Sequence, residues 1–236
     1  ADGIKVESSA KYDLGRSLQP LVHDRQGDPV HGEDRSGFFQ TVNRNKRSLS
    51  VDLKSDDGTD LVKRLVSEGD VDVVVESFRP GVMERLGRGY ETLSEANPDL
   101  IMCSVSGFGQ SGPYSGYKAY ASMLDPLASH AAVTGFPEDL PTSVGISMMD
   151  PLSGLFSAFA VLSALERRDS GGSGTHIDCS MLEVGASLVH PTITHYAVEG
   201  TAPERVGNRD ERGRYVQGVY RCAEDDVPPD REAWVA

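Results

Sequence analysis

The sequence has 236 residues, and its 36 acidic side chains against 23 lysines and arginines give a formal net charge of −13. With 38% hydrophobic residues, the composition is typical of a globular protein. The negative charge argues against a nucleic-acid partner, and no apolar run approaches the roughly 18 residues of a membrane span. Cys103, Cys179 and Cys222 have no CxxC spacing, so we expect reduced thiols and a cytoplasmic protein.

Both ends of the sequence suggest a piece of a longer protein. A strand-like run at residues 4–6 begins almost without preceding chain, and residues 232–236 stop on apolar side chains where another strand could begin. Natural termini usually trail off in polar residues. We therefore expect a fragment.

Strand and helix patterns alternate between residues 48 and 105. The run 71–75 is short and β-branched, as buried parallel strands are, and Asp56 and Asp57 offer N-cap oxygens to the helix that follows. The patterns predict strands at 48–53, 71–75 and 100–105 and helices at 59–67, 82–86 and 90–96. Strands separated by helices indicate βαβ units and a parallel sheet.

The next part of the sequence predicts mostly helix. Residues 119–133 and 181–198 are apolar and helical in pattern, and 175–178 is a short strand. The helix 151–168 carries an apolar stripe that we expect in the core, formed by Leu152, Leu155, Phe156, Phe159, Leu162 and Leu165. We predict an α/β domain over residues 1–199, a linker at 200–214 and the beginning of a small second domain at 215–236.

Gly107, Gly109 and Gly112 satisfy the GxGxxG spacing of a dinucleotide site. That site requires a helix to begin at the glycine loop, so that the pyrophosphate meets free backbone N–H groups. Residues 113–116 continue the loop, and no helix can start before about Ala119. A dinucleotide-dependent oxidoreductase therefore stays an alternative that needs a helix opening at residues 107–112.

Basic residues recur beside the predicted strands. Residues 43–47 hold three positive charges, which form either a solvated turn or a seat for a phosphate-bearing ligand. Lys54, Arg79, Arg85 and Arg88 then follow at the ends of the next elements, where ligands of parallel α/β sheets gather. Both interpretations of these cations remain open.

Asp150 precedes Pro151 at the head of an apolar helix. The residue can be an N-cap, which spacing alone favours, or a carboxylate nucleophile that the helix dipole keeps ionised. His176 and Cys179 alone do not make a metal site, and we predict no bound metal.

The segments together resemble the class III CoA-transferase family, the CaiB/BaiF type, which includes formyl-CoA transferase, carnitine-related CoA-transferases and α-methylacyl-CoA racemase. The resemblance covers most of the chain, in order, at residues 4–7, 43–48, 51–54, 76–81, 85–87, 97–98, 106–109, 112–113, 134–135, 150, 154 and 174–181. It implies a doubly wound, Rossmann-like parallel sheet, incomplete at both ends here, with the start of a small domain. It also implies interlocked homodimers, with a heteromer as another possibility.

The same resemblance implies the reaction and its residues. Asp150 takes the position of the family's catalytic aspartate, which exchanges CoA from an acyl-CoA donor to a carboxylic acid acceptor through anhydride and thioester intermediates. The positions that match the family's coenzyme A contacts are Val51, Asp52, Leu53, Lys54, Ser77, Phe78, Arg79, Arg85, Tyr117, Lys118, Ala119 and Tyr120. Ser77 departs from the family's usual asparagine.

Two alternatives remain beside CoA transfer. The family's racemases pair the aspartate with a histidine thirty positions earlier, where this sequence has Tyr120, and the nearest histidine is His130. A tyrosine with a pKa near 10 is a poor base at neutral pH, so transfer is favoured. A catalytically silent subunit that binds CoA is the second alternative, against which the retained Asp150 argues.

Overall fold

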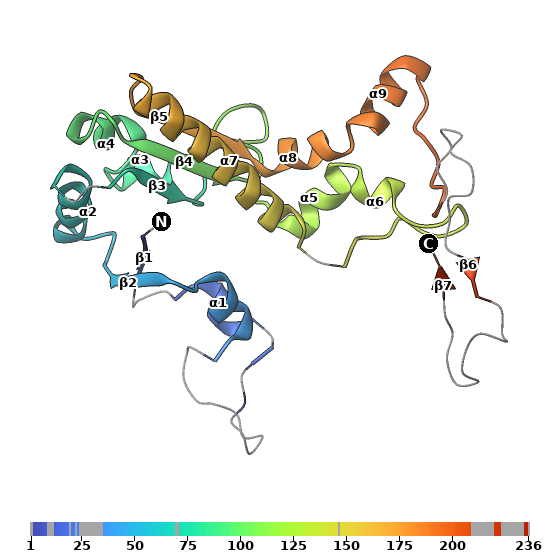
Figure 1. The fold of residues 1–236 in the computed structure, drawn as a ribbon, viewed down its shortest axis with the longest axis horizontal. Helices are drawn as coiled ribbons and strands as arrows, with labels where there is room; N and C mark the ends of the chain where they lie inside the picture. Colours follow the sequence, from blue (N-terminus) through green and yellow to red (C-terminus); the bar gives the residue numbers. More distant parts are fainter. Residues whose placement is uncertain are drawn as a thin grey trace. The chain divides into compact units, whose positions relative to one another are not determined.

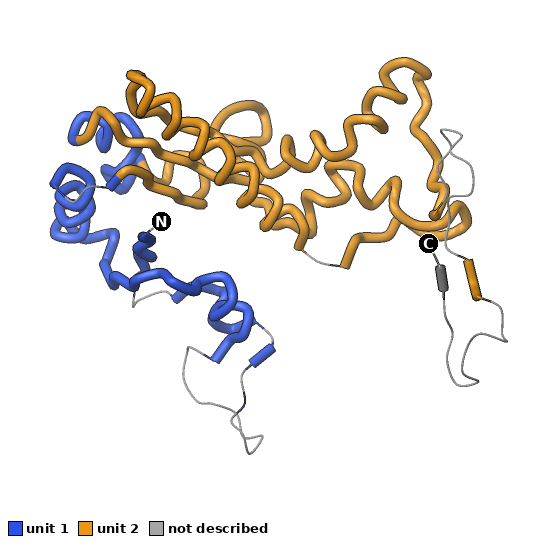
Figure 2. Tube along the Cα trace, in the orientation of Figure 1, with its two compact units in different colours: residues 1–71, 84–96 blue, residues 72–83, 97–236 orange. Residues whose placement is uncertain are grey.

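The computed structural model describes residues 2–8, 12–18, 20–21, 23, 35–68, 71–145, 147–208, 220–222 and 234–235. The chain folds into two compact units (Figure 2). The first unit is formed by residues 1–71 and 84–96, and the second by residues 72–83 and 97–236. Among the described residues, no helix is long and apolar enough to cross a membrane.

The first unit contains a parallel pair of strands and four helical segments. Its elements are β1 (Gly3–Glu7), the 3-10 helix η1 (Leu14–Ser17), α1 (Gly37–Val42), β2 (Lys46–Ser50), α2 (Asp56–Glu68) and α4 (Tyr90–Ala96). Gly3 of β1 lies opposite Lys46 of β2, and Glu7 lies opposite Ser50. Arg88 is 1% exposed and donates to the Leu53 carbonyl at 2.7 Å and to Thr59 Oγ1 at 2.8 Å, which ties the loop after β2 to α2.

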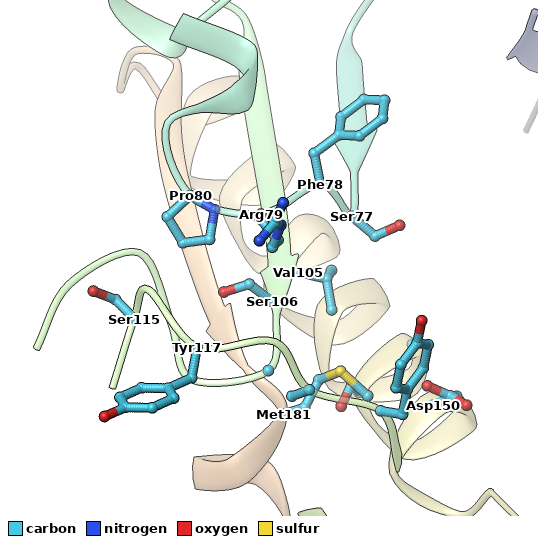
Figure 3. Close-up of a pocket in the computed structure, with 15 residues that line it drawn as sticks. Ser77, Phe78, Arg79, Pro80, Val105, Ser106, Ser115, Tyr117, Asp150 and Met181 are labelled. Carbon is cyan, nitrogen blue, oxygen red and sulfur yellow. The ribbon is translucent and has the colours of Figure 1, made fainter. Parts of the chain in front are cut away.

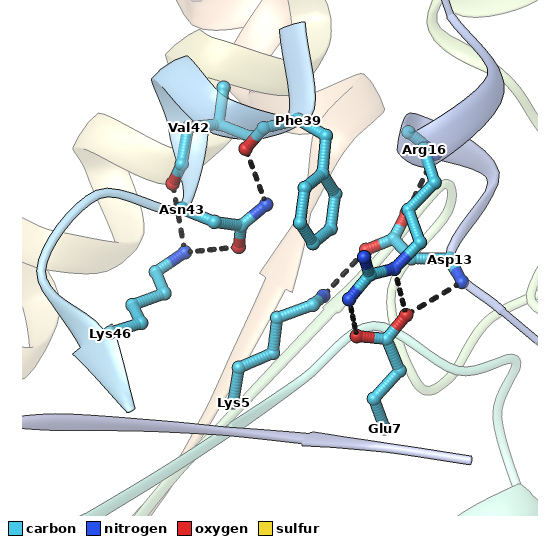
Figure 4. Close-up of polar contacts among 9 residues, drawn as sticks. Lys5, Glu7, Asp13, Arg16, Phe39, Val42, Asn43 and Lys46 are labelled. Atoms are coloured by element: carbon cyan, nitrogen blue, oxygen red, sulfur yellow. Dashed lines mark hydrogen bonds and ion pairs between the residues drawn. The ribbon is translucent and has the colours of Figure 1, made fainter. Parts of the chain in front are cut away.

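A network of charged side chains holds β1 against η1 (Figure 4). Arg16 donates to both oxygens of Glu7, at 2.8 and 2.9 Å, and its guanidinium lies 4.0 Å from the Phe39 ring centroid. Lys5 pairs with Asp13 at 2.5 Å, and the Asp13 backbone N–H donates to Glu7 at 3.0 Å. The hydrogen bonds from Arg16 outweigh the cost of burial and lower the pKa of Glu7 to about 2.

The second unit is built on a three-stranded parallel sheet in the order β3-β4-β5. Its strands are β3 (Val73–Glu76), β4 (Ile101–Ser106) and β5 (Thr175–Ser180), and its helices are α5 (Ala121–Leu127), α6 (His130–Val133), α7 (Met149–Asp169), α8 (Met181–Leu188) and α9 (His190–Glu199) (Figure 1). The residues of the short helix α3 (Val82–Arg85) are divided between the two units. The central strand β4 is buried at five of its six positions, including Ser104 and Ser106, as expected for a central strand of a parallel sheet.

The long helix α7 lies along β4 and β5 (Figure 1). Cys103 of β4, Cys179 of β5 and Val184 of α8 form the buried cluster beneath it, against which Leu152 and Val161 pack. The parallel sheet and the helix that covers it form the α/β fold that the sequence predicts.

The prediction that the apolar stripe of α7 lies in the core is wrong for four of its six residues. Leu155, Phe156, Phe159 and Leu162 are 67%, 43%, 74% and 64% exposed, whereas Leu152 and Leu165 are half-buried. The residues of α7 that are buried are Met149, Ser153, Ser157 and Ala164, most of them small. Small side chains let the helix backbone approach closely, so a mostly small face meets the sheet, with Leu152 and Val161 at its side, and most of the large apolar side chains point away.

Two predicted helices are interrupted. The prediction at 119–133 becomes α5 and α6, because Ser129 between them adopts a positive φ of 69°. The prediction at 181–198 becomes α8 and α9, with Pro191 in the first turn of α9. A proline has no N–H to donate, and the first turn of a helix is where that loss costs least.

The last part of the chain is described in pieces. Strands β6 (Tyr220–Arg221) and β7 (Trp234–Val235) form an antiparallel pair. The predicted linker 200–214 is described up to residue 208, and the rest of it lies outside the described residues. Most of the predicted small domain, 215–236, also lies outside them.

Replacing Glu7 with glutamine should destabilise the protein at neutral pH. The native pKa of about 2 against 4.5 corresponds to roughly 3 kcal/mol, which solvent screening reduces to about 2 kcal/mol. Because the pKa is lowered, this stabilisation is present above pH 4.5 and is lost as the pH falls towards 2. Urea denaturation should show a difference between parent and variant that narrows between pH 5 and 3. Glu68→Gln is the control, since Glu68 pairs with Arg64 only at 3.7 Å on the surface.

Candidate active site

A cavity of about 400 Å³ lies in the second unit, at the carboxyl ends of β3 and β4 (Figure 3). Its walls come from the segment after β3, the end of β4, the loop between β4 and α5, the first turns of α7 and the start of α8. The residues that line it are Ser77, Phe78, Arg79, Pro80, Val105, Ser106, Gly107, Ser115, Tyr117, Ala119, Tyr120, Asp150, Ser153, Gly154 and Met181. Ligand sites of parallel α/β sheets lie at this edge of the strands.

Asp150 enters the cavity from the first turn of α7. The N-cap of this helix is Met148, and its side chain makes no capping hydrogen bond, so the prediction of Asp150 as the N-cap is wrong. The Asp150 side chain is exposed, while the packing around its carboxyl disfavours the charged form and raises the pKa above the ordinary 3.8.

The core fixes the backbone on which Asp150 is mounted. The preceding residue, Met149, is completely buried in a cluster with Ala121 and Leu124. Gly185 of α8 permits this packing, because a Cβ there would lie 2.8 Å from Met149 Sδ. The first turn of α7 is thereby held between α5 and α8.

Gly154 keeps space open beside the Asp150 carboxylate. The two residues are four positions apart in α7 and therefore lie on the same face of the helix. A Cβ added at Gly154 would meet no atom within 4 Å, so the space beyond it is open. A helix-interior glycine costs stability, and this one widens the cavity at the carboxylate.

The segment after β3 brings a cation to the cavity. The Phe78 backbone N–H donates to Glu76 Oε2 at 2.7 Å, which sets the turn out of the strand. Arg79 follows, exposed and lining the cavity, and Phe78 is 42% exposed (Figure 3). A guanidinium at this place can bind a phosphate or a carboxylate.

The glycine loop between β4 and α5 does not start a helix. Gly109 and Gly112 have positive φ values of 81° and 93°, and the next helix, α5, begins only at Ala121. The structural context of a dinucleotide-binding GxGxxG, a helix opening at the loop, is therefore not met in this segment.

The cavity unites part of the predicted site. It brings together Asp150 with Ser77, Phe78, Arg79, Tyr117, Ala119 and Tyr120, whereas Lys118 lies on the same loop and is not part of the lining. Val51, Asp52, Leu53, Lys54 and Arg85 belong to the other unit. Sequence reasoning missed Ser106, Gly107, Ser153 and Met181 as cavity walls. The end of a predicted strand was a signal for the first two.

Among the described residues, no group of three or more His, Cys, Asp or Glu side chains is arranged to hold a metal ion. The cavity brings together the Asp150 carboxylate, which does not cap α7, and the Arg79 guanidinium. This arrangement suits covalent chemistry on a charged substrate.

Comparison with known proteins identifies the family. Residues 1–228 match CoA-transferase family III, and the chain belongs to it. It is 38% identical over 202 residues to succinyl-CoA--D-citramalate CoA-transferase of Chloroflexus aurantiacus, covering 83% of this chain and 50% of that protein. It is also 38% identical over 207 residues to acetyl-CoA:oxalate CoA-transferase of Acetobacter aceti, covering 87% and 50%.

The structure agrees with this membership. A crystal structure of a CAIB/BAIF family protein from Brucella suis superposes with a TM-score of 0.78 at 36% identity, covering 88% of this chain and 53% of that chain. The chain thus has the α/β fold with parallel sheets of these proteins, and it spans about half the length of the relatives it matches.

Gly154→Ala should stabilise the protein and narrow the cavity. Alanine in a helix interior is favoured over glycine by about 1 kcal/mol, and no neighbour obstructs the new methyl group. Urea denaturation should show this gain, and calorimetry should show weaker binding of ligands that reach Asp150. Ser163→Ala, on the exposed side of the same helix, is the control that should leave binding unchanged. Unaltered ligand binding in Gly154→Ala would contradict the role assigned to this space.

Proposed function

We propose that this protein is an acyl-CoA:carboxylate CoA-transferase in which Asp150 is the nucleophile. The observation that carries the proposal is the uncapped Asp150 carboxylate at the wall of the cavity, in a chain of CoA-transferase family III. The relatives named above use the carboxylic acids citramalate and oxalate. The substrate class proposed here is therefore an acyl-CoA donor and a carboxylate acceptor.

In the proposed reaction, an Asp150 oxygen attacks the thioester carbonyl of the donor and releases the CoA thiolate, which leaves a mixed anhydride. The thiolate then attacks the Asp150 carbonyl, forming an aspartyl-CoA thioester and releasing the donor acid. The acceptor carboxylate attacks this thioester and again gives an anhydride and a thiolate. Attack of the thiolate on the acceptor's acyl carbon forms the new acyl-CoA and frees Asp150.

The environment of Asp150 suits these steps. A carboxylate whose pKa is raised by burial is less stabilised by water and therefore more nucleophilic than an ordinary aspartate. Anhydrides are hydrolysed by water, so a bound substrate that fills the cavity protects the intermediates.

The proposed CoA site extends beyond the cavity. In the cavity, Arg79 would meet phosphate groups, and the loop residues Tyr117, Ala119 and Tyr120 would contact the nucleotide or the pantetheine arm. The positions proposed from the family resemblance in the other unit are Val51, Asp52, Leu53, Lys54 and Arg85. Ser77 is shorter than the asparagine usual at its position and would reach less far into the site.

The wider organisation is part of the same proposal. Residues 1–199 would form a Rossmann-like, doubly wound large domain, residues 200–214 a linker, and residues 215–236 the beginning of a small domain. The protein would act in the cytoplasm as an interlocked dimer, which a family of this kind implies.

Racemisation of an α-methylacyl-CoA is the second candidate function. Tyr120 takes the place of the racemase histidine and lines the same cavity as Asp150. Tyr120 is 68% exposed, and a phenol is a poorer general base than the imidazole that the racemases use. Proton abstraction is therefore disfavoured, and CoA transfer remains the proposed activity. The retained Asp150 also argues against a silent CoA-binding subunit.

Asp150→Ala should abolish CoA transfer and leave CoA binding within about twofold, since the variant removes the nucleophile and no phosphate contact. The assay mixes an acyl-CoA with an acceptor acid and follows the new thioester by mass spectrometry, while calorimetry measures CoA binding. Transfer at the parental rate would exclude Asp150 as the nucleophile. Deuterium uptake at the α-carbon without an acceptor acid would support racemisation instead.

The rate of transfer should fall at acid pH as Asp150 is protonated. Because burial raises the pKa of this carboxyl above the ordinary aspartate value of 3.8, the rate of transfer should begin to fall at a pH above 3.8. The measurement is kcat/KM from pH 4 to 8 with two acceptor acids of different pKa. The midpoint of the decrease at acid pH should be the same with both acceptors if Asp150 sets it. A midpoint that follows the pKa of the acceptor would show that Asp150 does not set it.

A further inference from the structure

The loop between β4 and α5 is a compact unit of its own. A Cβ at Gly107 would lie 2.3 Å from the Cβ of Ala119, so the two ends of the loop are in contact. Phe108, Tyr114 and Tyr117 pack their rings together with centroids 5.8 to 6.5 Å apart. The loop is thus internally packed before any ligand binds.

Two contacts fasten this loop to the junction of β5 and α8. Both carboxylate oxygens of Asp178 accept the Gln110 backbone N–H, at 3.0 and 2.9 Å. Gly109 lies against the same carboxylate, because a Cβ there would be 3.4 and 3.5 Å from its oxygens. The Leu182 backbone N–H donates to the Gly107 carbonyl at 3.0 Å.

The loop also forms one wall of the cavity that holds Asp150. Gly107, Ser115, Tyr117 and Ala119 line it, whereas Asp178 does not. Figure 3 shows Ser115 and Tyr117 on this loop. Asp178 therefore contributes no side chain to the cavity and bears on this wall through the loop that it holds. A charge-assisted hydrogen bond to a backbone N–H is stronger than a neutral one, so its loss should free the tip of the loop.

We propose that Asp178 is a positioning residue, which holds the loop of residues 107–119 in place as a preformed wall for the CoA substrate. This inference rests on the proposed function, since it assumes that CoA occupies the cavity. A wall that is fixed in advance spares the substrate the entropy cost of ordering it. Asp178 should therefore affect the affinity for CoA more than the chemical step at Asp150.

The test compares four variants in the full-length protein. Asp178→Ala removes both acceptor oxygens, Asp178→Asn keeps one, and Gly109→Ala disturbs the same contact from the loop, because alanine is strained at a φ of 81°. Asp169→Ala is the matched control, as it removes an equal charge at the exposed end of α7.

We expect the dissociation constant for CoA and the KM for acyl-CoA to rise about tenfold in Asp178→Ala and about threefold in Asp178→Asn, with kcat changing less. Hydrogen exchange at the Gln110 amide should accelerate in parallel. Because Asp178 and Gly109 act on one contact, the effects of Asp178→Ala and Gly109→Ala should be less than additive in the double variant. In the Asp178 variants, the KM for the acceptor acid should stay at its parental value. In Asp169→Ala, both the affinity for CoA and the KM values should be unchanged.

Faster exchange at Gln110 with an unchanged affinity for CoA would overturn the proposal, because the contact would then be structural only. If Asp178→Ala fails to fold, Asp178→Asn and Gly109→Ala test the same point. Fully additive effects of the two sites would also contradict it. A parent protein that binds CoA without transferring it would refute the proposed reaction and not the role of Asp178, whereas a parent that binds no CoA would refute both.

Discussion

The register of three parallel strands is the constraint on which the rest of the site depends. Glu76 of β3 lies opposite Ser104 of β4, which lies opposite Asp178 of β5. Because the strands run in the same direction, the segments that leave them begin at one edge of the sheet. Arg79, the glycine loop and α8 reach the same cavity for this reason. A slip of one residue would turn every side chain of a strand to the other face.

The covering helix completes the site because its small face meets the sheet. Ser153 uses its hydroxyl inside the helix, donating to the Met149 carbonyl at 2.7 Å, so its burial leaves no donor unpaired. Ser153 and Gly154 also line the cavity. The packing that brings α7 close to the sheet thus also determines how near a substrate can come to Asp150.

The sequence predicts the elements of this fold better than their contacts. The alternation of strands and helices, the helix at residues 90–96 and the absence of a helix at the glycine loop follow from local patterns and agree with the structure. The break at Ser129 depends on a positive φ that no pattern required, and the buried face of α7 depends on packing against β4 and β5. Periodicity shows that α7 has two faces, but only close approach to the sheet selects the one that is buried.

The same limit applies to the site. Arg79 and Asp150 were predicted as site residues from the family resemblance, and both line the cavity. Their positions after a strand and at a helix start had alone left other interpretations open. Ser106 and Met181 were not, since membership of the cavity depends on which loops meet at the sheet edge. The anchor between Asp178 and Gln110 joins residues 68 positions apart, and no local pattern indicates it.

Two carboxylates in this chain show how environment separates structural from reactive acids. Glu7 accepts two hydrogen bonds from Arg16 and one from a backbone N–H. These bonds stabilise the charged carboxylate and lower its pKa to about 2. Asp150 caps no helix, and the packing around it raises its pKa. A paired carboxylate is a weak nucleophile, since attack would break the bonds that stabilise it. Under the proposed function, Asp150 is the reactive acid because its carboxylate lines the cavity and is not engaged in capping the helix.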